Sequence, residues 1–425
     1  MKRLLVTLVL AVALPAAAQD LLIRDATVHT AGSRGTLKNT DVLVQGGVVR
    51  QVGPGLVAPA GVTVVEAKGR PLTPGLFGGL TGLGIEEVSG ESATVDHTLA
   101  MSATPNSHEH TWRPEFDVDV AFNPNSVAIG VNRVEGITFT VLSPSSTMGG
   151  SFVAGQGSAV LLDGRYDAVL PGSRSLFVNL GGGASPLSGG SRAGQWMLLE
   201  QAIAEARAGA ATGDDGLLTR AGRTSLARYL AGGRVVFQVD RAADIRQVLA
   251  FARKHGLKPV IVGGAEAWMV ADDLKAANAP VLLDALANLP STFDALGSTL
   301  ENAARLHRAG VAVGFTQSGD ATHNARKVRQ LAGVAVANGL PWEAGLAALT
   351  AVPAQVFGVS AQRGRIEPGQ VADLVLWSGD PLEVNTVAEQ VWFDGRAASM
   401  RSRQTELRDR YLQAPGTLPR AYSGR

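Results

Sequence analysis

Asp320 and His323 have the residue types and spacing that suit general acid–base chemistry. A carboxylate that orients an imidazole ring makes the ring a usable proton acceptor for a reacting group. Both residues follow the apolar strand-like run Val311–Phe315 and open a predicted helix, so we expect them near the end of a strand. The alternative is a helix cap, in which Asp320 or Thr322 binds free backbone N–H groups and His323 lies in the first turn.

Further polar residues lie at the ends of predicted strands or at the starts of predicted helices, which are places where a ligand would be bound. These candidates for substrate binding are Gln238, Glu266, Gln317, Asn324 and Arg326. Glu266 also has a structural interpretation, because an acidic residue is favoured at the start of a helix. No Ser–His–Asp arrangement and no G-x-S-x-G elbow is found, so a serine-hydrolase mechanism is not indicated.

Three histidines, His97, His108 and His110, lie in one long predicted connection. In an extended chain His108 and His110 share a side and could chelate a metal ion. The sequence offers no recognisable third ligand and no partner to orient the two rings. An exposed polar loop is the alternative. We therefore expect zinc or a similar divalent metal only if this non-standard site exists.

The elements that must position these residues alternate between strand and helix over residues 74–358. Gly136–Leu142 predicts a buried strand, and Ala243–His255 predicts a helix with Ile245 and Val248 on one face. Such alternation indicates parallel βαβ units. The number of units and the length of the range suit a (β/α)8 barrel. An open, doubly wound sheet is the structural alternative.

Both ends of the chain carry short strand patterns instead. Residues 19–73 contain the runs Leu21–Val28 and Asp41–Val52, and residues 359–400 contain the run Ala372–Trp377. We expect the two ranges to combine into one small β-sandwich. Residues 401–425 are charged and predict a helical tail.

Residues 1–18 have the pattern of an export signal. Lys2 and Arg3 precede an apolar run, and small residues lead up to Ala18. The apolar run is short for a helix that spans a bilayer, although an N-terminal anchor is an alternative. The sequence predicts a periplasmic or secreted protein that is cleaved near Ala18 and has no membrane span.

Composition excludes several classes of protein. The 425 residues are 45% hydrophobic and 18% charged, which is the balance of a packed chain rather than a disordered one. Lys and Arg number 38 against 37 Asp and Glu, so no bulk charge favours nucleic acid. The chain has no Cys, which excludes disulfides, thiolate nucleophiles and cysteine-ligated zinc.

Motifs at both ends of the predicted barrel resemble the amidohydrolase superfamily, in its imidazolonepropionase-like branch. The motifs are Gly69–Leu76 before the barrel, and Gly364–Gly369 followed by Ala372–Val375 after it. The resemblance covers nearly all of the chain after the export signal. It implies a (β/α)8 barrel with a β-sandwich built from both chain ends. It also implies hydrolysis of non-peptide C–N bonds in amides or cyclic amides, with divalent metal at the barrel mouth.

The positions that would hold this metal carry other residues here. The resemblance places the usual H-x-H pair on Leu80 and Gly82. It places a fifth-strand histidine on Gln238 and the last-strand aspartate on Gln317, and the sixth-strand stretch Ile261–Gly264 offers no histidine. None of these side chains is an ordinary zinc ligand, which argues against the usual metal mechanism.

Two functions therefore stay open. The first is an exported hydrolase of amide or cyclic amide bonds with a degenerate metal site. The second is a catalytically inactive relative that binds a small amide-like molecule or a partner protein, such as an active paralogue. Both functions are compatible with a homo-oligomer.

Overall fold

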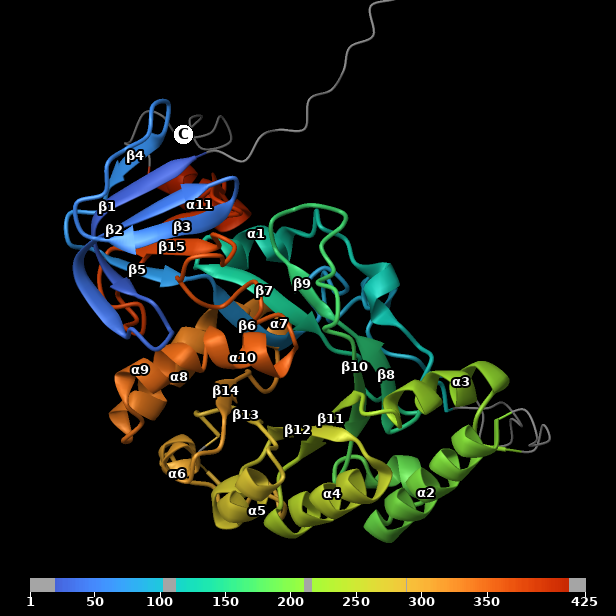
Figure 1. The fold of residues 1–425 in the computed structure, drawn as a ribbon. Coiled ribbons are helices and arrows are strands. Elements are labelled where there is room, and N and C mark those ends of the chain that lie inside the picture. The colour runs from blue at the N-terminus through green and yellow to red at the C-terminus, as the bar shows by residue number, and fades with distance from the viewer. Residues whose placement is uncertain (1–19, 102–111, 210–215, 288, 413–425) are drawn as a thin grey trace, which may run out of the picture.

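The computed structural model describes residues 20–101, 112–209, 216–287 and 289–412 (Figure 1). The predicted export signal, His108 and His110 lie outside these residues. Figure 1 shows a β-sheet at one end of the molecule and a larger part in which helices surround shorter strands. No helix within the described ranges is both long and apolar enough to cross a membrane.

Strands from both chain ends form one eight-stranded sheet, in the order β17-β16-β15-β5-β1-β2-β3 with β4 paired to β1. The strands are β1 (Leu21–His29), β2 (Thr36–Gln45), β3 (Val48–Gly53), β4 (Thr63–Glu66), β5 (Pro71–Pro74), β15 (Leu374–Trp377), β16 (Ala388–Phe393) and β17 (Arg396–Ala397). The antiparallel pairing of Leu72 with Leu376 joins the two ends. The structure thus connects these strands in a single sheet, where the sequence predicted a sandwich.

The central strands form two further sheets, β6-β7-β9 and β14-β13-β12-β11-β10-β8. They are β6 (Leu76–Thr81), β7 (Ile137–Leu142), β8 (Val153–Gly157), β9 (Ala159–Leu161), β10 (Ser175–Asn179), β11 (Arg234–Val239), β12 (Lys258–Gly263), β13 (Val281–Leu283) and β14 (Val313–Phe315). The β6–β7 pair and the ladder from β10 to β14 are parallel, but β8 and β9 pair antiparallel with their neighbours. The fold is therefore mixed α/β.

The described residues do not close these strands into one continuous ladder, because β14 and β6 lie in different sheets. A glycine break in β6 accounts for part of this. Gly79 has a φ of +90°, and the register of β6 against β7 shifts between Phe77 and Leu80. A Cβ atom on Gly79 would lie 2.9 Å from Thr316 Oγ1, so only glycine allows β14 to approach this closely.

Helices cover the outer side of the central strands (Figure 1). They are α1 (Val127–Arg133), α2 (Arg192–Ala208), α3 (Arg220–Tyr229), α4 (Ala242–His255), α5 (Ala271–Ala276), α6 (Asn302–Arg308), α7 (Ala321–Asn324), α8 (Val328–Ala337), α9 (Trp342–Ala347) and α10 (Ala351–Val356), with α11 (Arg403–Tyr411) in the predicted tail. The helix predicted around Ile245 and Val248 is confirmed as α4, with both residues buried. It ends at Gly256, whose φ of +72° suits a glycine cap.

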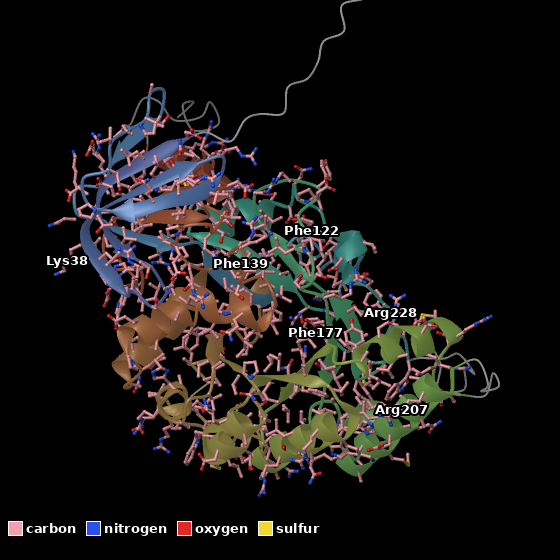
Figure 2. All side chains as sticks on the ribbon, in the orientation of Figure 1. Lys38, Phe122, Phe139, Phe177, Arg207 and Arg228 are labelled. Atoms are coloured by element: carbon pink, nitrogen blue, oxygen red, sulfur yellow. The ribbon has the colours of Figure 1, made fainter. Side chains whose placement is uncertain are left out.

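Aromatic side chains fill the space between the central strands. Phe77 lies 5.2 Å from Phe139 and 5.8 Å from Phe357, measured between ring centroids. Figure 2 shows Phe139 and Phe177 toward the middle of the molecule and Lys38 at its edge. Because side chains of this size pack closely, the interior is a filled core and not a channel. Ligands must bind where the strands end.

One indole joins the terminal sheet to the rest of the chain. Trp377 in β15 is fully buried, and its Nε1 donates a hydrogen bond to Thr73 Oγ1 at 2.9 Å. The guanidinium carbon of Arg329, in α8, lies 4.9 Å from the centroid of this indole. A Cβ atom on Gly136, just before β7, would collide with the ring at 2.5 Å. Strand β7 therefore begins directly against the terminal sheet.

Candidate functional site

A polar cavity of about 570 Å³ opens where the parallel strands end. Its lining includes Thr81 and Gly82 from the end of β6, Ser143 after β7, Gln238 in β11, Val262 and Gly263 in β12, Asp284 after β13, and Thr316 and Gln317 after β14. We call this space the mouth cavity. Strands that run parallel bring their carboxyl ends to one face, so segments far apart in sequence meet there.

The four positions that the resemblance assigned to metal ligands all line the mouth cavity. They carry an aliphatic side chain at Leu80, no side chain at Gly82, and neutral amides at Gln238 and Gln317. Zinc in proteins is held by imidazole, thiolate or carboxylate groups. Within the described residues no cluster of three or more His, Asp or Glu side chains is arranged to hold a metal. This donor set does not fit a divalent metal centre.

A carboxylate fills the space left by the missing side chain of Gly82. A Cβ atom on Gly82 would lie 3.0 Å from Glu86 Oε2 and 2.9 Å from Thr322 Oγ1. The Thr322 hydroxyl donates to Glu86 Oε2 at 2.8 Å and accepts from the Gly82 N–H at 3.0 Å. Glu86 lines the mouth cavity with a side chain only 8% exposed. Glycine at position 82 is thus what makes room for this buried carboxylate.

His97 lies beside this carboxylate and also lines the mouth cavity. Its Nε2 is 3.5 Å from Glu86 Oε2, and its Nδ1 is buried without a hydrogen-bond partner among the described residues. Burial lowers the pKa of His97, against the opposing effects of Glu86 and Asp96. The backbone N–H of Ser145, which follows β7, donates to the His97 carbonyl at 2.8 Å and fixes this segment.

Sequence reasoning missed Glu86 altogether and treated His97 as part of a polar loop. The usable signal was an acidic residue four positions after Gly82, since a strand end followed closely by Glu places that side chain near the cavity. Its partner Thr322 is 236 residues away in sequence, so the spacing of residues gives no hint of the contact.

The structure brings the predicted pair Asp320 and His323 into contact, but only Asp320 lines the mouth cavity. Asp320 lines the mouth cavity and caps α7, where its side chain accepts a hydrogen bond from His323 N at 3.2 Å. His323 is not part of the cavity lining. Its Nδ1 faces Asp320 Oδ1 at 3.2 Å and its Nε2 faces the Glu87 carbonyl at 3.1 Å. The geometry has the features of the helix-cap interpretation.

The predicted substrate-binding residues fall into two groups. Gln238 and Gln317 line the mouth cavity, whereas Glu266, Asn324 and Arg326 do not. The Glu266 carboxylate is buried and accepts from the backbone N–H groups of Ala242 and Gly297, both at 3.0 Å. Arg326 donates to the His323 carbonyl and lines a different cavity, next to Glu135. Glu266 and Arg326 thus hold loops and helix ends together.

We predict that stability falls as the pH is lowered, and that His97 contributes to this fall. Because burial depresses the pKa of His97 in the folded state below 6.5, the unfolded chain binds a proton more readily. The stabilisation from neutral His97 is complete above the pKa of His97 in the unfolded chain. It is lost as the pH falls from there through the lower pKa of the folded state. Urea unfolding between about pH 7.5 and about pH 5.5 checks this, since H97N should lose less free energy of unfolding than wild type. Equal losses in both proteins would contradict it.

Sequence comparisons match parts of the chain. The profile of the Amidohydrolase family matches residues 320–398. Amidohydrolase tasK of Hapsidospora irregularis is 46% identical over 59 residues, which make up 14% of this chain and 6% of that protein. The chain therefore aligns with only a small fraction of this relative.

Structure comparisons cover most of the chain. An amidohydrolase from Thermotoga maritima MSB8 is similar with a TM-score of 0.77 and 25% identity, over 90% of this chain and 100% of that one. Molinate hydrolase has a TM-score of 0.53 and 13% identity, over 90% of this chain and 95% of its own. N-isopropylammelide isopropylaminohydrolase from Burkholderia multivorans ATCC 17616 has a TM-score of 0.50 and 16% identity, over 89% and 98%. The last two show the fold alone.

The profile match and the Thermotoga likeness agree with the motifs found at both ends of the predicted barrel. They do not address the proposed branch or the replaced ligand positions. Together they show the likeness to the amidohydrolase superfamily that the motifs predicted, in sequence over residues 320–398 and in fold over most of the chain.

Proposed function

We propose that the chain is an exported hydrolase of non-peptide C–N bonds, and that a small amide or cyclic amide binds in the mouth cavity. The likeness to amidohydrolases supports the class of reaction, and two proteins of similar fold are named as hydrolases of molinate and N-isopropylammelide. The observation that carries the proposal is the Glu86 carboxylate, held in the cavity beside His97. It supplies a proton acceptor at the strand ends without using a metal ion.

In this proposal Glu86 acts as the general base. Its Oε2 is occupied by the Thr322 hydroxyl, while none of the described residues donates a hydrogen bond to Oε1. Oε1 takes a proton from a water molecule, whose oxygen attacks the carbonyl carbon of the amide. The same proton then passes to the leaving nitrogen as the C–N bond breaks, which releases a carboxylic acid and an amine and restores Glu86.

We assign the role of general base to Glu86 and not to His323, because both ring nitrogens of His323 already have protein partners. Both ring nitrogens of His323 face protein oxygens, and the ring does not line the cavity. Asp320 lines the cavity but is exposed, so water screens its charge more than that of the buried Glu86. His97 is a positioning residue, which packs beside the Glu86 carboxylate and shields it from solvent.

Neutral groups of the cavity suit an amide ligand. The lining includes the side-chain amides of Gln238 and Gln317 and the hydroxyls of Ser143 and Ser145. Such N–H and O–H donors stabilise a carbonyl oxygen as it gains charge. Gln317 Oε1 is buried and has no hydrogen-bond partner among the described residues. An amide N–H of the ligand would satisfy this acceptor, which otherwise costs free energy.

The proposal includes the type of fold, a (β/α)8 barrel. We propose that β6, β7, the β8–β9 segment and β10 to β14 are the eight wall positions of a (β/α)8 barrel, with the third position antiparallel. The order of the ladders supports this. The remaining seam is bridged by Leu80 N, which donates to Thr316 Oγ1 at 2.9 Å. An experimental structure that lacks this contact would contradict the assignment.

We also propose that the mature protein is periplasmic or secreted. The proposal rests on the basic start at Lys2 and Arg3, the apolar run and the small residues before Gln19. N-terminal sequencing of the protein recovered outside the cytoplasm should find a start near Gln19. Recovery of the intact chain with Met1, still in the membrane fraction, would contradict it.

The hydrolase proposal predicts that E86Q abolishes turnover. This substitution keeps the shape of the side chain but removes the proton acceptor, so kcat/KM should fall by about 10²-fold or more. The assay is the appearance of a free amino group, as an amine or ammonia from linear amides and as an amino acid from lactams, in a panel incubated with the mature protein. E87Q is the matched control, since Glu87 is the adjacent residue and its side chain does not line the mouth cavity.

A second function is favoured by the neutral side chains at the former ligand positions, namely Leu80, Gln238 and Gln317 together with Gly82. It is binding of the same amides without hydrolysis. Wild-type protein that binds a panel amide but releases no amine above the buffer rate would replace the hydrolase with this binding protein. Turnover that persists in E86Q would contradict the role given to Glu86.

A further inference from the structure

A second cavity, of about 740 Å³, adjoins the mouth cavity. Gln238 lines both, so the two spaces meet at the end of β11. The second cavity is bordered by the segments around Asn179 and Gly182, and by Asp240 and Asp294. The two cavities therefore border the same side chain, and a ligand that passes Gln238 would occupy both.

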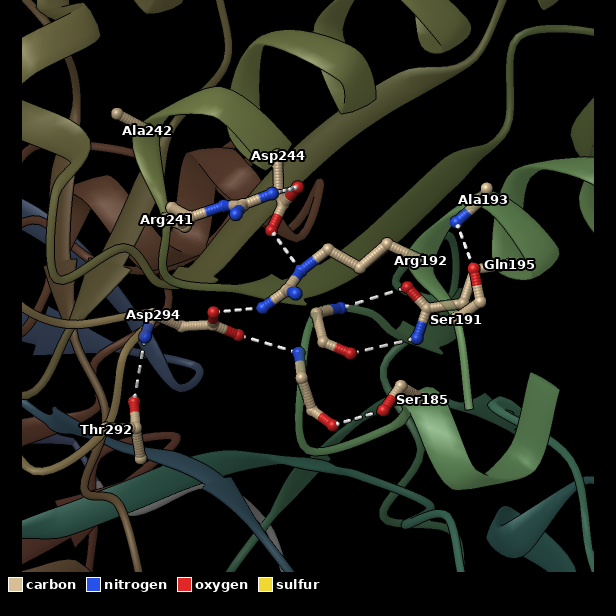
Figure 3. A network of polar contacts seen from close by, with 12 residues as sticks. Ser185, Ser191, Arg192, Ala193, Gln195, Arg241, Ala242, Asp244, Thr292 and Asp294 are labelled. Atoms are coloured by element: carbon tan, nitrogen blue, oxygen red, sulfur yellow. Dashed lines mark hydrogen bonds and ion pairs between the residues drawn. The ribbon is translucent and has the colours of Figure 1, made fainter. Parts of the chain in front are cut away.

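Figure 3 shows the polar network around Arg192, which lines the side cavity together with Gly182 and Asp294. Arg192 lies between Asp294, with which it forms an ion pair, and Asp244, whose Oδ2 lies 3.1 Å from its Nε. Arg241 pairs with the other oxygen of Asp244 at 2.7 Å. Asp294 also accepts the Gly182 N–H at 2.6 Å. Both guanidinium groups are thus committed to Asp244 and Asp294, and the loop that carries Asp294 is tied to the glycine-rich segment.

Asp240 is left without a cation. It forms no ion pair with any described residue, and the one hydrogen bond to its side chain comes from Ala265 N to Oδ1 at 3.3 Å. Burial raises the pKa of Asp240, and the charges of Asp294 and Glu266 raise it further. A half-buried carboxylate that lines a cavity and lacks a counter-charge is short of a cationic partner.

The position of Asp240 ties it to the mouth cavity in a second way. A Cβ atom on Gly263 would lie 2.5 Å from Asp240 Oδ1. Gly263 itself lines the mouth cavity, within the sixth-strand stretch where the resemblance expects a histidine. The missing side chain of Gly263 leaves room for this carboxylate, just as Gly82 leaves room for Glu86.

We infer that Asp240 receives a cationic group, such as a primary ammonium, of the ligand whose amide occupies the mouth cavity. This deepens the proposed function and rests on it, since it names the substrate as an amide that also carries an amine. Asp240 directly follows β11, two residues after Gln238, and two residues of extended chain span about 7 Å. A chain of about four to five bonds between the amide and the amine spans that distance.

Two amides of equal chain length test this, 5-aminopentanamide and pentanamide. Isothermal titration calorimetry on the mature protein reports binding heat and any continuing heat of hydrolysis in the same run. We expect the amine to bind about tenfold or more tightly than the neutral amide, and D240N to remove this preference while it still binds pentanamide. D167N removes the same charge from an exposed residue with no ion pair in the described structure and should keep the preference.

The outcomes separate this inference from the proposed function. Equal affinities for the two amides, with hydrolysis of either, would overturn the role of Asp240 and leave the hydrolase in place. A preference for the amine that depends on Asp240, without hydrolysis, would support the inference and replace the hydrolase with a binding protein. A preference that survives in D240N, or failure of the wild type to bind either amide, would overturn the inference.

Discussion

The site depends on one hydroxyl, that of Thr322, at the seam between the first and last parallel strands. Backbone N–H groups in a buried position need partners, and β6 obtains none from β14 because the two strands share no ladder. Side chains take over this function. Thr316 Oγ1 accepts the Leu80 N–H, and Thr322 Oγ1 accepts the Gly82 N–H while it donates to Glu86. The seam and the buried carboxylate are therefore stabilised by the same contacts.

Two glycines then explain how acidic groups come to lie where metal ligands would be expected. Gly82 makes space for Glu86, and Gly263 makes space for Asp240. The surroundings of the two carboxylates differ and suit different roles. Glu86 is held by a hydroxyl and lies beside a histidine, which suits proton transfer, whereas Asp240 has a single long backbone contact, which suits a charged ligand. In this account the mouth cavity and the side cavity divide the recognition of one molecule between them.

The sequence was sufficient for features that depend on local patterns. Apolar periodicity located α4, and the motif ending at Leu76 identified Leu80 and Gly82, which both line the mouth cavity. The family resemblance also pointed to Gln238 and Gln317, which belong to two other strands and line the same cavity. Parallel strands explain why these four positions meet, because their carboxyl ends lie at the same face.

The remaining features depend on contacts between distant segments. The hydrogen bond from Thr322 to Glu86 joins residues 236 positions apart, and nothing in either segment alone predicts it. The antiparallel β8–β9 segment departs from the expected all-parallel order, since its halves pair with different neighbours, β10 and β7. Glu266 precedes a helical turn but makes no side-chain hydrogen bond to it, and its carboxylate accepts instead from the first N–H of α4, at Ala242, and from the N–H of Gly297.

We propose that a ligand in the mouth cavity is bound and hydrolysed without the metal centre that the superfamily implies. The most direct measurement is the zinc content of the mature protein, determined by elemental mass spectrometry after incubation with zinc and extensive dialysis. We expect no zinc above that of a dialysed blank, because Leu80, Gly82, Gln238 and Gln317 offer no ordinary ligand. Retention of about one zinc ion or more per chain would contradict it and would direct attention to His108 and His110.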